Sequence, residues 1–141
     1  MLNDNEIKTL IENAVKMLQR SYIPYSNFAV GASLMTEEGR IYNGCNIENA
    51  AFTPSNCAER TAFFKAVSEG ESRFKAIAIV GGPGRIIKDY CPPCGVCRQV
   101  MQEFCNPETF NIILAKDTDD YKILSLKDLL PLGFGSADLN A

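Results

Sequence analysis

Two short cysteine motifs constrain the fold of this chain more than any other feature. Residues 57–60 read Cys-Ala-Glu-Arg, and residues 93–97 read Pro-Cys-Gly-Val-Cys. If both motifs bind one metal ion, the fold must bring together two segments that are far apart in the chain. Three thiolates suit Zn²⁺, and a zinc ion with three protein ligands keeps a fourth position open for water. Glu59 could move the protons of that water, so the motifs indicate a hydrolytic site rather than a structural metal.

Each motif is predicted to lie at the start of a helix. Cys57 follows Ser55 and Asn56, whose side chains can cap a helix. Cys94 follows two prolines, which are favoured where a helix begins. Because a helix N-terminus stabilises negative charge, both positions favour the thiolate form that binds metal. Cys94 and Cys97 are about one helical turn apart, so both sulfurs can reach the same ion.

Three thiolates carry more negative charge than one zinc ion can neutralise, and this excess raises the pKa of a bound water. Arg60 follows the first motif and is predicted to balance the charge by hydrogen bonding to sulfur. Arg98 could serve in the same way or lie on a solvated helix face. The chain contains no histidine, so proton transfer falls to other side chains, and Glu59 is the candidate.

The composition is that of an ordinary globular protein. The chain has 141 residues, of which 46% are hydrophobic and 22% are charged, so a single domain over residues 1–141 is expected. The net charge of -3 and the absence of a basic run argue against a nucleic-acid partner. The polar N-terminus does not resemble a signal peptide, and no apolar stretch could span a membrane. We therefore expect a cytoplasmic protein whose six cysteines do not form a disulfide framework.

Hydrophobic periodicity indicates alternating helices and strands. Helices are predicted over 4–19, with Asp4 as its N-cap, and over 57–69, 94–104 and 125–130, the last capped by Ser125. Strands are predicted over 28–35, 41–45, 75–80, 111–115 and 121–124, with 81–84 as a loop. The order predicts an α/β fold, namely a three-layer α/β/α sandwich with a mixed sheet of about five strands and helices on both faces.

Four ordered blocks carry a resemblance to a known family. Residues 25–32, 44–51, 56–62 and 93–99 resemble the conserved segments of the small, three-cysteine cytidine deaminases, and residues 129–134 resemble their tail. The two cysteine motifs also match the ligand-x-Glu and Pro-Cys-x-x-Cys signature of zinc deaminases. The resemblance covers nearly the whole chain. It implies zinc-dependent hydrolysis of cytidine and deoxycytidine to uridine and deoxyuridine, with release of ammonia, in pyrimidine salvage.

The resemblance also implies a role for each matched residue. One zinc ion per chain would be bound by Cys57, Cys94 and Cys97. Glu59 would shuttle protons, and the backbone N–H of Ala58 would bind the carbonyl oxygen of the base. Phe28 would pack against the nucleoside, and Asn46 and Glu48 would hold a ribose hydroxyl. Arg60 would balance the charge of the zinc site.

Members of this family are typically homotetramers whose subunits complete one another's pockets, so the resemblance implies a second copy of the chain as partner. Phe134 is a candidate for such a shared contact. Two residues depart from the family pattern. Phe52 stands where a tyrosine is frequent, and Pro92 stands where a serine is frequent. A backbone carbonyl survives at Pro92, so a contact to the substrate's amino group could persist there.

Two alternatives remain open from the sequence. Cys91 could join the three motif cysteines in a closed four-sulfur shell, which would make the metal structural and the protein a binding module. The two prolines after Cys91 disfavour that arrangement. Alternatively, a deaminase could act on a polynucleotide or on a cytosine-containing antibiotic. The acidic composition disfavours the polynucleotide, whereas the sequence leaves the antibiotic open.

Overall fold

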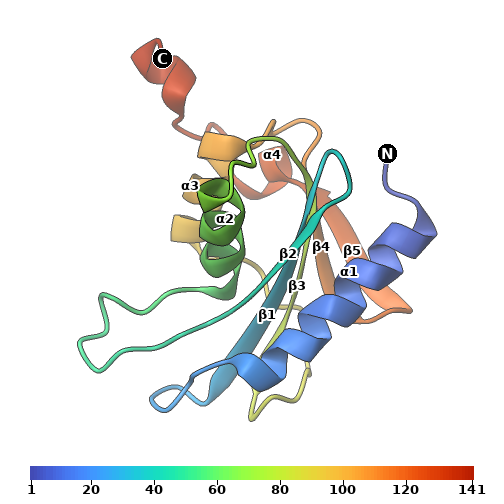
Figure 1. Ribbon diagram of the computed structural model, residues 1–141, viewed down its shortest axis with the longest axis vertical. Coiled ribbons are helices and arrows are strands. Elements are labelled where there is room, and N and C mark those ends of the chain that lie inside the picture. The colour runs from blue at the N-terminus through green and yellow to red at the C-terminus, as the bar shows by residue number, and fades with distance from the viewer.

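A five-stranded mixed sheet in the order β2-β1-β3-β4-β5 forms the centre of the computed structural model, which describes residues 1–141 (Figure 1). Strands β3 and β4 are parallel, and every other neighbouring pair is antiparallel. The strands are β1 (Phe28–Thr36), β2 (Ile41–Cys45), β3 (Phe74–Pro83), β4 (Asn111–Asp117) and β5 (Asp120–Ser125). The predicted number of strands and the mixed sheet are confirmed.

Helices cover both faces of this sheet, as the three-layer prediction requires. Helix α1 (Asp4–Met17), which continues into the 3-10 turn η1 (Leu18–Arg20), packs on one face with one hydrophobic cluster. On the other face lie α2 (Ala58–Ser68), α3 (Gly95–Phe104) and the short α4 (Leu126–Leu129), with a second cluster. The C-terminal 3-10 turn η2 (Ser136–Leu139) projects away from the sheet (Figure 1). No helix combines the length and the apolar character that a bilayer crossing needs.

The N-cap of α1 differs from the prediction. Asn3, not Asp4, caps the helix: its side chain accepts the backbone N–H of Glu6 at 2.8 Å. The Glu6 carboxylate accepts the backbone N–H of Asn3 in return, at 3.1 Å. This reciprocal capping box satisfies two backbone N–H groups that the start of a helix would otherwise leave unpaired. A single aspartate side chain at position 4 could not satisfy both groups. The prediction of Ser125 as the N-cap of α4 is confirmed.

Strand β3 is longer than predicted because its glycines permit close packing. Residues 81–84 were predicted to form a loop, but Gly81 and Gly82 continue β3 and pair with β1. A Cβ atom at Gly81 would lie 2.9 Å from the Sγ of Cys91, and one at Gly82 would lie 1.8 Å from the carbonyl oxygen of Ile86. The segment that leads to α3 therefore packs directly on the strand, which sets the position of the second cysteine motif.

Helix α2 is positioned by a similar close approach. A Cβ atom at Gly44, near the end of β2, would lie 2.4 Å from the carbonyl oxygen of Ala58 and 2.6 Å from the amide nitrogen of Ala62. Only glycine allows the first turn of a helix to come so near to a strand. The first cysteine motif is thus held against the sheet, on the same face as the second motif.

Candidate metal centre and substrate pocket

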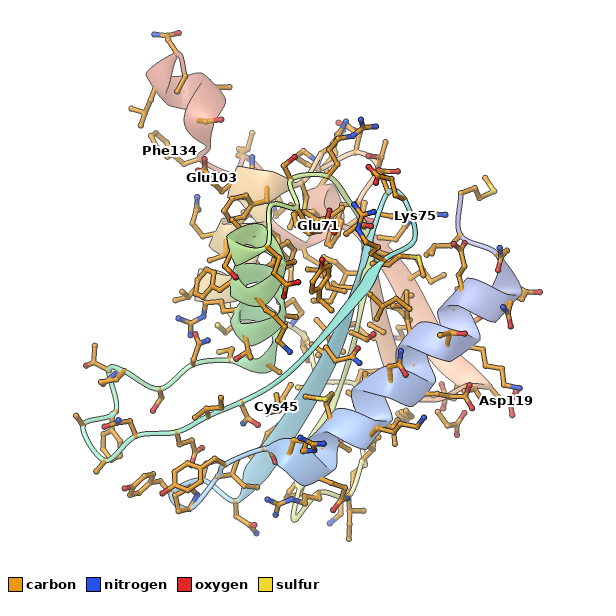
Figure 2. All side chains as sticks on the ribbon, in the orientation of Figure 1. Cys45, Glu71, Lys75, Glu103, Asp119 and Phe134 are labelled. Carbon is orange, nitrogen blue, oxygen red and sulfur yellow. The ribbon has the colours of Figure 1, made fainter.

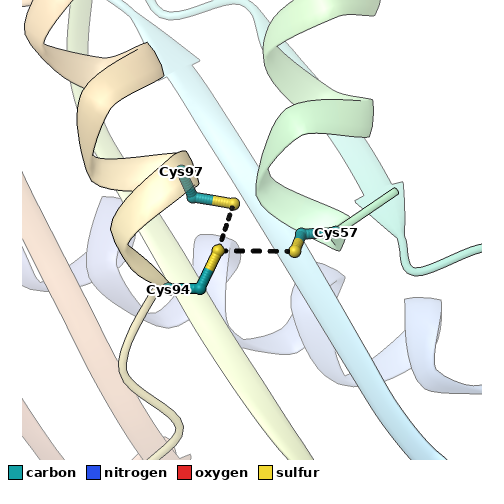
Figure 3. A group of neighbouring side chains, drawn as sticks. All are labelled: Cys57, Cys94 and Cys97. Carbon is teal, nitrogen blue, oxygen red and sulfur yellow. Dashed lines mark hydrogen bonds between the residues drawn. The ribbon is translucent and has the colours of Figure 1, made fainter. Parts of the chain in front are cut away.

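The sulfur atoms of Cys57, Cys94 and Cys97 all lie within 4.8 Å of one another. The Sγ of Cys94 is 3.7 Å from that of Cys57 and 3.6 Å from that of Cys97 (Figure 3). Cys57 is the N-cap of α2 and Cys94 is the N-cap of α3, so both motifs stand at helix starts as predicted. The expectation that Ser55 or Asn56 caps α2 is wrong, because Cys57 itself occupies that position.

This sulfur cluster fits a zinc ion. A tetrahedral zinc with Zn–S bonds of about 2.3 Å separates its sulfur ligands by about 3.8 Å, close to the two observed distances. The cluster contains three sulfurs and no fourth ligand side chain. An ion bound here would keep one coordination position for another molecule, which is typical of catalytic rather than structural zinc.

Arg60, predicted to bond to sulfur, and Arg98, left open by the sequence, have different surroundings. The Nη2 of Arg60 donates to the Sγ of Cys57 at 3.2 Å, which places a positive charge beside the thiolate. Arg98 instead donates to the carbonyl oxygens of Pro93 and Leu129, at 2.8 and 2.7 Å. Arg98 therefore ties the start of α3 to the end of α4, and Arg60 is the arginine at the sulfur cluster.

The environment of Cys57 favours its charged form even without metal. Hydrogen bonding from the Cys97 thiol, followed by the Arg60 guanidinium and the Cys94 thiol, lowers the pKa of Cys57 to about 5. A thiolate is the form that ligates metal. The Nε–H of Arg60 is buried and has no hydrogen-bond partner within the chain, so this guanidinium retains an unused donor near the sulfurs.

Glu59 lies in the first turn of α2 with only 4% of its surface exposed. Burial raises the pKa of its carboxyl to about 7, and the neighbouring charge of Cys57 adds to the effect. A carboxyl group that titrates near neutral pH can both accept and release a proton, as general acid–base catalysis requires. Its catalytic role remains a prediction, and its burial and pKa support it.

A cavity of about 310 Å³ adjoins the sulfur cluster. Its wall includes six of the predicted site residues, namely Asn46, Glu48, Cys57, Glu59, Arg60 and Cys94. Cys97 is buried behind the wall, and Phe28 and Ala58 do not line the cavity. A larger cavity of about 600 Å³ beside Met1 and Lys75 contains none of these residues. The smaller cavity is the candidate site because thiolates, a buried acid and polar side chains converge there.

Comparison with known proteins agrees with this geometry. The family model described as "Cytidine and deoxycytidylate deaminase zinc-binding region" matches residues 4–113. The chain belongs to the cytidine and deoxycytidylate deaminase family. The resemblance inferred from the four sequence blocks is thereby confirmed.

Individual members of the deaminase family match over nearly their full length. The cytidine deaminase of Sporosarcina psychrophila is 45% identical over 135 residues, covering 96% of each chain. That of Halalkalibacterium halodurans is 44% identical over 131 residues, covering 93% of this chain and 96% of the relative. The crystal structure of the cytidine deaminase from Burkholderia pseudomallei superposes with a TM-score of 0.81 at 44% identity, covering 89% of this chain and 97% of the other.

The side chains of the predicted sugar-binding residues of this deaminase also hydrogen-bond to the backbone of a distant segment, residues 25–30. Asn46 accepts the backbone N–H of Val30 at 2.9 Å and donates to the carbonyl oxygen of Phe28 at 2.8 Å. Glu48 accepts the backbone N–H groups of Tyr25 and Ser26, at 3.0 and 3.1 Å. Both side chains therefore hold the start of β1 while they line the cavity. The sequence blocks pointed to Asn46 and Glu48 but not to this second task.

Phe28 and Ala58 are placed beside the cavity rather than in its wall. The Phe28 side chain is 40% exposed at the start of β1, so it is not a core residue. Ala58 is the first residue of α2, and a backbone N–H at that position has no partner within the helix. Each therefore keeps a group that a substrate could contact, and both roles remain predictions.

The two departures from the family pattern have identifiable surroundings. Phe52 has a backbone φ of 62°, a strained value for an aromatic residue, and its side chain is 70% exposed. Its ring packs edge-on against Tyr25, with 6.0 Å between centroids. Pro92 lines the cavity beside Cys91 and Cys94, and a contact of its carbonyl group with the substrate's amino group stays a prediction.

The remaining cysteines lie outside the sulfur cluster. Cys45, at the end of β2 (Figure 2), and Cys105 are buried. Burial raises the pKa of the Cys91 thiol to about 12, and this thiol packs against Gly81 of β3. The geometry therefore disfavours the four-sulfur alternative.

Cys91→Ser is expected to leave zinc content unchanged and to lower activity by less than about threefold, because a serine hydroxyl fills nearly the same space beside the cavity. Metal analysis of the purified variant and its steady-state kinetics check this expectation. Cys105→Ser, at the opposite end of α3 from Cys94, is the matched control. If the Cys91 variant loses zinc and the Cys105 variant does not, the closed four-sulfur structural site is the better interpretation.

Proposed function

We propose that this protein is a zinc-dependent hydrolase that converts cytidine and deoxycytidine to uridine and deoxyuridine, releases ammonia and serves pyrimidine salvage. The observation that supports this proposal is the single cavity that joins a three-sulfur cluster, a buried carboxyl with a pKa near 7, and two polar side chains suited to a sugar. Cys57, Cys94 and Cys97 would hold one zinc ion per chain.

Glu59 carries the proton transfers in this proposal. Zinc, when bound, supplies a Lewis acid that lowers the pKa of a water molecule. The Glu59 carboxylate would take a proton from the attacking water molecule and give it to the ring nitrogen of cytosine. The water oxygen forms a bond to the amino-bearing carbon, and the bond from that carbon to the amino group breaks. Glu59 carries the second proton to the leaving group, which departs as ammonia.

The other predicted residues orient the nucleoside for this chemistry. The Ala58 backbone N–H binds the base carbonyl oxygen at the start of α2, where the helix favours negative charge. Asn46 and Glu48, which line the cavity, hold a sugar hydroxyl, and Phe28 packs against the nucleoside. Orientation of this kind lowers the entropic cost of the reaction.

We also propose that the active form is a homotetramer whose pockets are shared between subunits. Large apolar side chains are exposed on α2, on α3 and on the C-terminal segment, namely Phe64, Val96, Leu132 and Phe134. A contiguous apolar patch is typical of a surface that another protein covers, and these side chains are the candidates for such a patch. Phe134 lies where the chain leaves the body (Figure 2), and its carbonyl oxygen accepts the Gln99 side chain at 2.8 Å. This bond ties the segment to α3.

Ammonia release from a panel of cytosine compounds tests the proposed function. Zinc-loaded protein is expected to deaminate cytidine and deoxycytidine, and a chelator that removes the metal is expected to abolish both activities. An oligodeoxycytidylate and blasticidin S represent the polynucleotide and antibiotic alternatives. The proposal is wrong if the zinc-loaded protein releases ammonia from either alternative but from neither nucleoside.

A further inference from the structure

The turn before β1 contains a serine that contacts two of the predicted substrate residues. The hydroxyl of Ser26 donates to the Oε2 of Glu48. The same hydroxyl oxygen accepts the backbone N–H of Phe28 at 3.0 Å. Since the Asn46 side chain also donates to the carbonyl oxygen of Phe28, one hydrogen-bond network joins the side chains of Asn46 and Glu48 to the backbone of Phe28 through this turn.

The hydrogen bonds of Glu48 leave a defined place for one more donor. Its Oε1 accepts two backbone N–H groups, those of Tyr25 and Ser26, which fills the usual capacity of a carboxylate oxygen. Its Oε2 accepts only the Ser26 hydroxyl, so this oxygen can accept one further hydrogen bond. Glu48 lines the cavity, and a sugar hydroxyl bound there would therefore share Oε2 with Ser26.

No cation neutralises Glu48. It takes part in none of the ion pairs of the chain. The Ser26 hydroxyl, together with the backbone N–H groups of Ser26 and Tyr25, instead holds the pKa of Glu48 below its usual range. A carboxylate kept ionised in this way offers only acceptors, so its ligand must supply a hydrogen.

We propose that Ser26 is a positioning residue: it holds Glu48 so that Oε2 faces the substrate's sugar hydroxyl, and thereby sets how strongly the protein selects for that hydroxyl. The inference rests on the proposed function, in which Glu48 binds the sugar. Ser26 is the single side chain bonded to this carboxylate, whereas its other two donors belong to the backbone. Removing the Ser26 hydroxyl therefore frees the oxygen that the substrate uses and leaves the other oxygen held.

Two substrates that differ in one hydroxyl test this inference. Deoxycytidine has a 3′ hydroxyl and 2′,3′-dideoxycytidine lacks it, and the wild type is expected to prefer deoxycytidine by about a hundredfold or more in kcat/KM. Ser26→Ala is expected to lower kcat/KM for deoxycytidine about tenfold, mainly through KM, because hydrogen bonds to a charged group are among the stronger ones. For dideoxycytidine the loss should stay below about twofold, so the preference for the hydroxyl falls by nearly tenfold.

Three further variants complete the design. Ser26→Thr keeps a hydroxyl on an exposed side chain and should restore the preference for deoxycytidine over dideoxycytidine. Ser26→Gly removes the hydroxyl and should behave like the alanine variant. Ser68→Ala is the matched control, since its hydroxyl donates only to the carbonyl oxygen of Lys65 in a neighbouring turn. Thermal unfolding of each variant shows whether the fold is kept.

Several outcomes would overturn the positioning role. Equal losses on both substrates, an unchanged preference, or alanine and glycine variants that do not fold would assign Ser26 a purely structural role. A wild type that deaminates both substrates equally would show that Glu48 does not hold the hydroxyl, while leaving the proposed deamination reaction intact. A zinc-loaded wild type inactive on deoxycytidine and cytidine would instead remove the proposed function, and this inference with it.

Discussion

Glu59→Gln is expected to lower kcat by about ten-thousand-fold or more, with zinc content unchanged. Glutamine has nearly the same shape but cannot carry a proton, and general acid–base catalysis is worth on the order of a hundred- to ten-thousand-fold. We expect the upper end because one carboxyl serves several transfers. Steady-state kinetics with cytidine, metal analysis and thermal unfolding measure the three quantities.

The fold should tolerate this change because of the sign of the Glu59 pKa shift. Burial raises the pKa of Glu59 in the fold from its ordinary value near 4.5 to about 7. The metal-free fold therefore loses stability as the pH rises above about 4.5, because the unfolded chain releases this proton more readily than the fold does. A neutral amide removes that cost, and the metal-free variant should be at least as stable as wild type at pH 8. Glu69→Gln, at the exposed C-terminal end of the same helix, is the matched control. A Glu59 variant within tenfold of wild-type kcat would rule out this residue as the proton shuttle.

Free cytosine is expected to be deaminated with a kcat/KM about ten-thousand-fold below that of cytidine. Asn46 and Glu48 line the cavity, and polar groups built to bind a hydroxyl are left unpaired when the hydroxyl is absent, which is how binding sites reject analogues strongly. Cytidine and deoxycytidine should both be good substrates because they share the 3′ hydroxyl. Comparison of kcat/KM across the three compounds checks the expectation.

Cytidine 5′-monophosphate should also be a poor substrate, by about a hundredfold or more relative to cytidine. Its phosphate brings close to two negative charges toward a cavity whose wall contains the carboxyl groups of Glu48 and Glu59. Arg60 is the one cationic side chain in that wall, and it already binds Cys57. Comparable kcat/KM for cytidine and its 5′-monophosphate would show that this interpretation of the pocket is wrong.

The sequence alone determined the parts of this protein that depend on local spacing. Cys94 and Cys97 are one helical turn apart, so their convergence follows from helix geometry without knowledge of the rest of the fold. Hydrophobic periodicity likewise predicted the helices and strands and the mixed sheet, because each element must bury one face. The ordered blocks around these motifs were enough to identify the family that the comparisons confirmed.

Local spacing was insufficient wherever a residue's partner comes from a distant segment. Both arginines follow a cysteine of the motifs, yet only Arg60 donates to sulfur, while Arg98 reaches the end of α4. The continuation of β3 through Gly81 and Gly82 depends on a segment that packs on those glycines from above the sheet, so the two residues read as a loop in isolation.

The tertiary structure alone decided which polar groups act together. Cys91 lies three residues from Cys94 but packs against β3, outside the sulfur cluster. Ser26 and Glu48 are 22 positions apart, and no sequence periodicity relates them, yet their side chains hydrogen-bond. The helix and strand periods of a sequence show only which side chains within one element share a buried face. A hydrogen bond between two loops depends instead on where the whole sheet places those loops.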